Sequence, residues 1–198
     1  MPQDLDPRPA TDRGADPSRF VIETPHLLLR YMTVQEDAEF VLRLLNDPAF
    51  IHNIGDKGVR SIEDAGRYID EGPRASYARF GFGLYTVVVK ASGESIGICG
   101  LVKRDFLDDV DMGYALLPQF RGMGYAIEAA SAAMRYGADT LRIPRIVAIT
   151  HPENERSIRV LEKLGLQSKG VLVLKGETRP TLLFAPSAET EGRPPLAT

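Results

Sequence analysis

The sequence predicts one mixed α/β domain, with a mainly antiparallel sheet of about seven strands flanked by helices. Segments with a two-residue apolar period alternate along the chain with segments that repeat every three or four residues, and no segment repeats another. Three consecutive strand patterns mid-chain are joined by short polar segments, as in an antiparallel meander. The chain has 198 residues, of which 43% are apolar, enough for one sizeable core. We place this domain at residues 20–185.

Both ends of the chain are predicted to be disordered tails, at residues 1–19 and 186–198. They are polar and proline-rich, so burial cannot offset the entropy of ordering them. Residues 1–19 lack the apolar core of a signal peptide, and no apolar run reaches the roughly 18 residues of a membrane span. The single cysteine, Cys99, allows no internal disulfide and fits a small core residue better than a nucleophile. We expect a cytoplasmic protein without a membrane partner.

The domain is predicted to begin with a strand and a helix. Residues 19–32 have the pattern of a strand with a bulge or break at Pro25. Thr33 and Glu36 follow at the spacing of a capping box, which marks the start of a helix over residues 33–47.

A second helix and a hairpin come next. Ser61 is a candidate N-cap for a helix over residues 61–72. Residues 83–102 place two β-rich runs on either side of a short polar turn, which is typical of a hairpin. Residues 110–118 continue as a third strand of this meander.

The last third of the domain starts with the strongest helix pattern, over residues 121–141. Residues 145–152 then read as a short buried strand, and Asn154 and Gly165 as the cap and the stop of a further helix. Residues 170–185 read as two strands around the turn 175–178. The apolar face of the first of these helices is formed by Ile127, Ala130, Met134, Ala138 and Leu141.

The junction between the strand 110–118 and the helix 121–141 is a candidate anion site. Gly122 and Gly124 remove side chains where the strand ends and the helix starts, so several backbone N–H groups can point at one bound group. The helix dipole contributes about 0.3 to 1 kcal/mol for an anion there, and Arg121 adds a positive charge. This combination predicts a pyrophosphate site.

Other ligands for this junction are excluded or disfavoured. The chain has no Walker loop, and Ile127 stands where a Rossmann fingerprint needs a small residue, which disfavours a dinucleotide. A net charge of -3 provides no positive field for a nucleic acid. The three histidines have no metal-ligand spacing, so we expect no metal.

The chain resembles the GNAT superfamily of acyl-CoA N-acyltransferases, in its RimJ/RimL-like branch. Arg121, Gly124 and Ala126 fit the signature Arg/Gln-x-x-Gly-x-Gly/Ala, and residues 112–166 resemble this branch continuously. The resemblance runs from Ile22 to Phe184. It implies a sheet whose two central strands splay apart, with acetyl-CoA as the acyl donor.

The resemblance also implies which residues bind the cofactor. The pantetheine arm would enter the gap between the splayed strands and meet backbone groups of Leu116 and Leu117. Asn154 would contact the arm or the thioester end. The pyrophosphate would be held by Arg121, Gly122, Met123, Gly124, Tyr125 and Ala126.

The catalytic residues are harder to assign than the cofactor-binding residues. Many family members carry a tyrosine proton donor where this chain has Leu161, and the nearest substitute is Ser157, which occupies a serine slot of RimL-like members. The alternative is that Ser157 serves only the first helical turn and Asn154 is an ordinary cap. Asp111 occupies a position where many relatives have a glutamate, and is either the general base or a solvated strand-end acid.

The function implied is N-acetylation of a primary amine, either a protein or peptide N-terminus or a small amine. The alternative is an acyl-CoA-binding module that has lost turnover, because the usual tyrosine is absent. We expect the acceptor pocket to be built by the two early helices and the loop 45–61. A homodimer is possible, because an edge strand of the sheet could pair with a second copy.

Overall fold

The computed structural model describes residues 20–173 and 180–187 of the chain. The predicted tail 1–19, the turn 175–178 and nearly all of the predicted tail 186–198 lie outside the described residues. Eight strands form one sheet in the order β1-β2-β3-β4-β5-β6-β8-β7, and every neighbouring pair is antiparallel except β5 and β6. The strands are β1 (Phe20–Glu23), β2 (Leu27–Arg30), β3 (Leu84–Val89), β4 (Ser95–Lys103), β5 (Val110–Leu116), β6 (Ile146–Thr150), β7 (Leu166–Val173) and β8 (Pro180–Pro186).

The predicted mixed α/β fold is confirmed, with eight strands in place of about seven. The extra strand arises at Pro25, where the expected bulge or break is a full turn. The backbone N–H of Thr24 donates to the carbonyl of Leu27 at 3.0 Å, and the segments on either side pair as an antiparallel hairpin. Proline has no N–H for a sheet ladder and a fixed φ, so a turn satisfies the backbone better than a continuous strand.

Two short helices were not predicted. The predicted loop 45–61 contains α2, which has Asp47 as N-cap and Pro48 in its first turn. A π-helical segment at Asp70–Arg74 carries the third helix on into α4, with Pro73 inside it. Six-residue helices are too short to show an apolar period. The helices are α1 (Val34–Leu45), α2 (Pro48–Asn53), α3 (Ile62–Ile69), α4 (Ala75–Phe80), α5 (Tyr125–Asp139) and α6 (Glu155–Lys163).

The predicted N-caps of α1 and α3 are confirmed, with one change of partner. Thr33 caps α1, but its own N–H donates to Asp37 Oδ2 at 2.9 Å and not to Glu36. Asp37 is fully buried, and Arg30 donates to both of its oxygens at 2.8 Å. A buried carboxylate with two charge-assisted partners is a stronger anchor than an exposed glutamate. Ser61 caps α3 as predicted.

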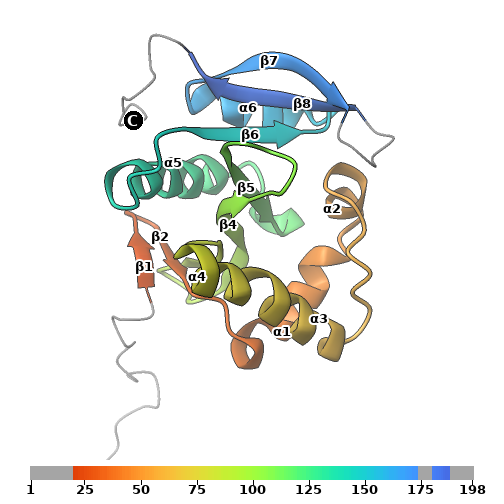
Figure 1. Ribbon diagram of the computed structural model, residues 1–198. Coiled ribbons are helices and arrows are strands. Elements are labelled where there is room, and N and C mark those ends of the chain that lie inside the picture. The colour runs from red at the N-terminus through yellow and green to blue at the C-terminus, as the bar shows by residue number, and fades with distance from the viewer. Residues whose placement is uncertain (1–19, 174–179, 188–198) are drawn as a thin grey trace, which may run out of the picture.

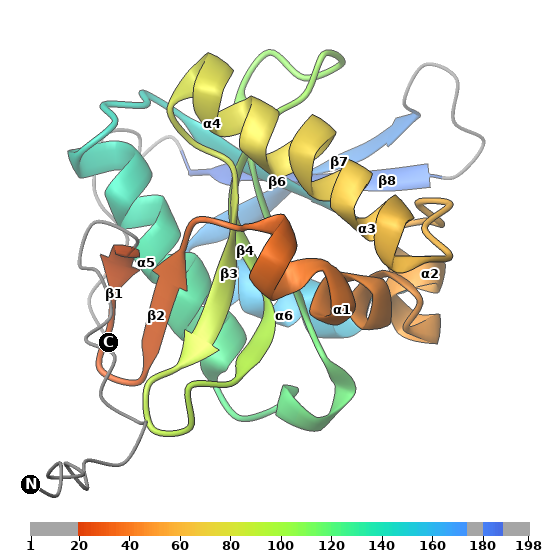
Figure 2. The same cartoon turned by 90° about the horizontal axis from the view of Figure 1, so that it is seen from below.

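Helices cover both faces of the sheet (Figure 2). One apolar core lies between the sheet and α5 and α6, and a second lies between the sheet and α1 and α3. Cys99 is buried in the first core, where burial raises the pKa of its thiol to about 12. It is a core residue, as predicted. Among the residues that the structure describes, no helix is long and apolar enough to cross a membrane.

The sheet divides between β5 and β6. Only Val110 and Asp111 of β5 pair with β6, through Ile146 and Val147. Beyond these two pairs, β6 pairs on its other side with β8, while β5 keeps its full ladder with β4. Figure 1 shows the result, with β6, β8 and β7 grouped apart from β4 and β5. The predicted splay of the two central strands is therefore present.

Candidate active site

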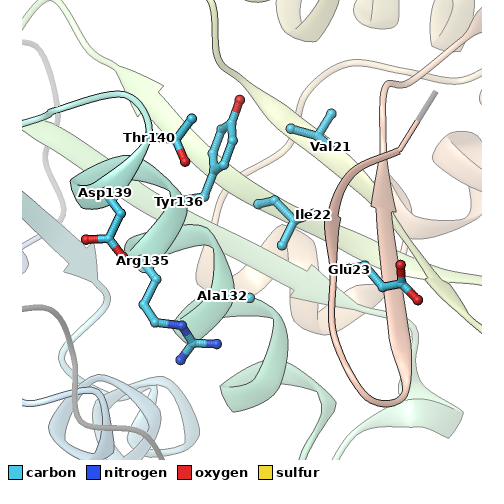
Figure 3. Close-up of a pocket in the computed structure, with 8 residues that line it drawn as sticks. All are labelled: Val21, Ile22, Glu23, Ala132, Arg135, Tyr136, Asp139 and Thr140. Atoms are coloured by element: carbon cyan, nitrogen blue, oxygen red, sulfur yellow. The ribbon is translucent and has the colours of Figure 1, made fainter. Parts of the chain in front are cut away.

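A large cleft opens where the two strands separate. Its volume is about 1970 Å³, and it is lined by β5, the end of β6, α2, α4 and the start of α6. A second hollow, of about 300 Å³, lies between β1 and the later part of α5, and the side chains that line it are drawn in Figure 3. None of the predicted site residues lines this second hollow. The cleft at the split is the candidate active site.

The β5–α5 loop presents backbone donors to the cleft. Gly122 and Gly124 adopt φ values of 81° and 88°, a left-handed conformation that side chains disfavour. The backbone hydrogen bonds of α5 begin with that from the N–H of Glu128 to the carbonyl of Gly124, at 3.1 Å. Within the described residues, the N–H groups of Tyr125 to Ile127 have no acceptor. These amides, at the positive end of a helix dipole, form a cradle for an anion.

The Arg121 side chain does not point its charge freely into this cradle. Its Nε donates to the carbonyl of Leu116 at 2.9 Å, and its guanidinium forms an ion pair with Asp47. The N–H of Leu117 donates to the carbonyl of Ile96 at 2.9 Å. Arg121 is thus in the loop as predicted, but its charge is already balanced within the protein, and the cradle consists mainly of backbone amides.

Asp111 lies at the point where the sheet divides. Its side chain is 1% exposed, Oδ2 accepts from Arg104 Nε at 2.5 Å, and Oδ1 accepts from the N–H of Ile149 at 3.2 Å. Burial raises the pKa of Asp111, although Arg104 and the Ile149 N–H oppose this. The carboxylate joins β5 to β6 across the split and also lines the cleft. It is not the fully solvated acid of the alternative interpretation.

The opposite wall of the cleft carries Asn154 and Ser157. Asn154 caps α6, since its Oδ1 accepts from the backbone N–H of Ser157 at 3.2 Å. The Ser157 side chain is half-buried and lines the cleft beside Tyr114 of β5. Burial raises the pKa of Tyr114, an effect that the Ser157 hydroxyl opposes. A serine and a tyrosine hydroxyl therefore meet in the cleft from opposite sides of the split.

Comparison with known proteins assigns this architecture. The family model described as an acetyltransferase (GNAT) domain matches residues 26–167. The chain belongs to the GNAT acetyltransferase family. An N-acetyltransferase of Bacillus subtilis, YoaA, is 30% identical over 154 residues, covering 77% of this chain and 85% of YoaA. The [ribosomal protein uS5]-alanine N-acetyltransferase of Escherichia coli is 34% identical over 112 residues, covering 54% and 56% of the two chains.

The solved structures agree. A GNAT-family acetyltransferase from Bacillus anthracis superposes with a TM-score of 0.69 at 26% identity, over 83% of this chain and 96% of that one. GNAT acetyltransferases use acetyl-CoA as the acyl donor, so the predicted donor is supported. The similarity to a ribosomal-protein acetyltransferase supports the RimJ/RimL-like branch. The residues present fit this donor, because the diphosphate of CoA suits the amide cradle and the split leaves room for an extended arm.

In this GNAT acetyltransferase, Leu161 stands where many family members have a tyrosine proton donor, and it is a core residue. Leu161 is 1% exposed and packs in the core under α6. Tyr114 brings a phenol to Ser157 from β5. It could not be predicted from sequence, because a tyrosine in an apolar strand 43 residues before Ser157 is expected to be a core residue.

The structure also pairs two histidines that the sequence left apart. The rings of His52, at the end of α2, and His151, after β6, lie 5.9 Å apart at the cleft. His151 Nδ1 accepts from the N–H of Glu153 at 3.2 Å, which leaves the ring proton on Nε2 when the ring is neutral. The described residues contain no group of three or more His, Cys, Asp or Glu that could hold a metal.

Proposed function

We propose that this GNAT acetyltransferase transfers the acetyl group of acetyl-CoA, in the cytoplasm, to an α-amino group, that of a protein or peptide N-terminus or of a small amine such as a free amino acid. The observation that carries the choice of acceptor is the state of Asp111. Both of its oxygens already accept hydrogen bonds, one of them from a cation. It can therefore take a proton from the acceptor through a water molecule, for which about two of the four acceptor sites of the carboxylate remain.

A base that acts through a water molecule suits an α-amine better than a lysine. An α-ammonium with a pKa of about 7.7 to 8.0 costs about 1 kcal/mol to deprotonate at pH 7. A lysine side chain, with a pKa of about 10.4, costs about 4.6 kcal/mol at 1.36 kcal/mol per pKa unit. The similarity to an acetyltransferase that acts on the alanine of a ribosomal protein is consistent with this choice.

The protons then move as follows. The ammonium gives one proton through water to Asp111, which passes it to solvent, and the free amine attacks the thioester carbonyl, forming the C–N bond. The remaining excess proton on nitrogen leaves to solvent as the C–S bond breaks. The departing thiolate takes a proton from Ser157, which is resupplied by solvent in the cleft. The products are an amide and the free thiol of CoA.

The test is release of CoA thiol with matched acceptors. One peptide has a free N-terminus and no lysine, and its partner has a blocked N-terminus and one lysine; spermidine and an aminoglycoside complete the panel. We expect turnover with the free N-terminus at least tenfold above that with the blocked lysine peptide. Turnover only on the lysine peptide, spermidine or the aminoglycoside would overturn the proposal. CoA binding without thiol release from any acceptor would favour the binding module.

A further inference from the structure

Asp47 lies outside the predicted site but touches its cofactor side. It is the N-cap of α2, and its Oδ1 accepts from the N–H of Phe50 at 3.1 Å. The same oxygen pairs with the guanidinium of Arg121, 74 residues away in the chain. The Asp47 side chain is 8% exposed and that of Arg121 is 25% exposed. A buried carboxylate oxygen that accepts from both a backbone N–H and a guanidinium is fixed in position.

Arg121 extends this contact to two further elements. Its backbone belongs to the β5–α5 loop, and its Nε donates to the carbonyl of Leu116 at the end of β5. One guanidinium therefore joins the end of β5, the anion cradle and the start of α2. The start of α2 is fixed to the β5 half of the split sheet.

The other end of α2 reaches the β6 half. The helix has six residues, a length of about 9 Å at 1.5 Å per residue. His52, near its end, places its ring 5.9 Å from that of His151, which follows β6. In Figure 1, α2 lies beside the open side of the split. The helix thus spans from the β5 half to the β6 half, and its residues Phe50 to Asn53 line the cleft.

We propose that Asp47 is a positioning residue that, through Arg121, holds α2 as a strut between the cofactor cradle and the acceptor wall of the cleft. The inference rests on the proposed function, because it assumes that the cradle binds the diphosphate of CoA and that the acceptor enters beside α2. It assigns Arg121 a role distinct from the one predicted from sequence: its side chain sets the geometry of α2, while the backbone amides bind the diphosphate. Binding of CoA in the cradle should then slow hydrogen exchange at the end of α2.

The first test is a double-mutant cycle on the acceptor kinetics. Asp47→Asn keeps an oxygen that can cap α2 but removes the charge, and Arg121→Gln removes the other partner. We expect each single variant to raise the KM for the amine about tenfold with little change in the KM for acetyl-CoA, and the double variant to show no more than one single. Asp70→Asn, which breaks the exposed pair with Arg74, is the matched control and should leave both constants unchanged.

Two outcomes of the cycle would overturn the proposal. If the two single effects multiply to about a hundredfold in the double variant, the residues act independently. If the variants lower the melting temperature while both KM values stay unchanged, the contact is structural only.

The second test does not depend on turnover. Hydrogen exchange at the end of α2 is measured with and without CoA, using the N–H groups of Ile54 and Gly55, which follow the helix and donate to the carbonyls of Phe50 and Ile51 at 2.8 Å and 3.1 Å. CoA should slow their exchange at least threefold in the wild type and not in Asp47→Asn. Binding of CoA that leaves α2 exchange unchanged in the wild type would overturn the strut. Absence of CoA binding altogether would instead count against the proposed function.

Discussion

The two sides of the cleft are built from different materials. The side proposed to bind the cofactor is a turn of two glycines followed by helix amides that have no acceptor among the described residues, all within six consecutive residues. The acceptor side depends on ion pairs between side chains, Asp47 with Arg121, 74 residues apart, and Asp111 with Arg104, seven residues apart. Backbone donors keep their strength whatever the surrounding sequence, whereas a buried ion pair works only when both partners are brought together. Changes on the two sides should therefore separate cofactor binding from turnover.

The largest expected effect is that of Ser157→Ala. Loss of a proton donor costs about a hundredfold or more in kcat, while the KM for acetyl-CoA stays within about twofold. The cap of α6 is retained, because Asn154 accepts from the backbone of residue 157 and not from its side chain. Steady-state kinetics measure both constants, and Ser168→Ala in β7 is the control. Unaltered kcat would exclude Ser157 as the donor.

Gly124→Val should lower the affinity for CoA without changing the acceptor side of the cleft. A β-branched residue at a φ of 88° costs about 1 to 3 kcal/mol, so the loop moves and CoA affinity falls about tenfold to hundredfold. Isothermal titration with CoA measures the loss. Gly93→Val in the β3–β4 turn introduces a similar strain, at a φ of 70°, away from the cleft and should leave affinity unchanged. A folded Gly124→Val protein with wild-type affinity would contradict the cradle.

The pH dependence of kcat/KM in Asp111→Asn tests whether the acceptor side of the cleft takes part in proton transfer. If Asp111 takes the proton of the amine, the variant should lose about tenfold in kcat/KM at pH 7. The deficit should shrink above pH 8, where the α-amine loses its proton without help. A deficit that is constant from pH 6 to pH 9 would instead indicate that Asp111 only joins β5 to β6. Melting curves across this range show whether the fold is retained.

The smallest effect concerns stability. Burial by itself would raise the pKa of Glu128, but hydrogen bonds from Thr24 and His26 outweigh it and hold the pKa below its usual value. The stabilisation is therefore complete above the unfolded pKa of about 4.3 and is lost as the pH falls through the folded value. Glu128→Gln should lower the melting temperature by a few degrees at pH 7 and by less below pH 4. Glu155→Gln, an exposed acid of α6, should show no such dependence.

The fold and the cofactor side could be predicted from sequence for one reason. Strand periods, the caps Thr33, Ser61 and Asn154, and the glycines of the loop are local signals, and the structure confirms the elements that they predicted. The helix face predicted for residues 121–141 was right only in part, because Ala130 and Met134 are buried while Ile127 is only partly so. The alanine-rich side of α5 packs closest to the sheet.

The acceptor side could not be predicted in this way. α2 has too few residues to show a period, and Tyr114 sits in an apolar strand with nothing to mark its contact with Ser157. Asp47 and Arg121 are 74 residues apart, and neither residue type specifies its partner.

The sequence by itself determined the order of the longer strands and helices, the glycine turn before α5 and the family to which the chain belongs, because each depends on neighbours in the chain. Only the tertiary structure decided where the sheet divides, which charge balances Arg121 and which hydroxyl meets Ser157. These features depend on burial and on contacts between segments distant in sequence, and such contacts exist only once the chain has folded.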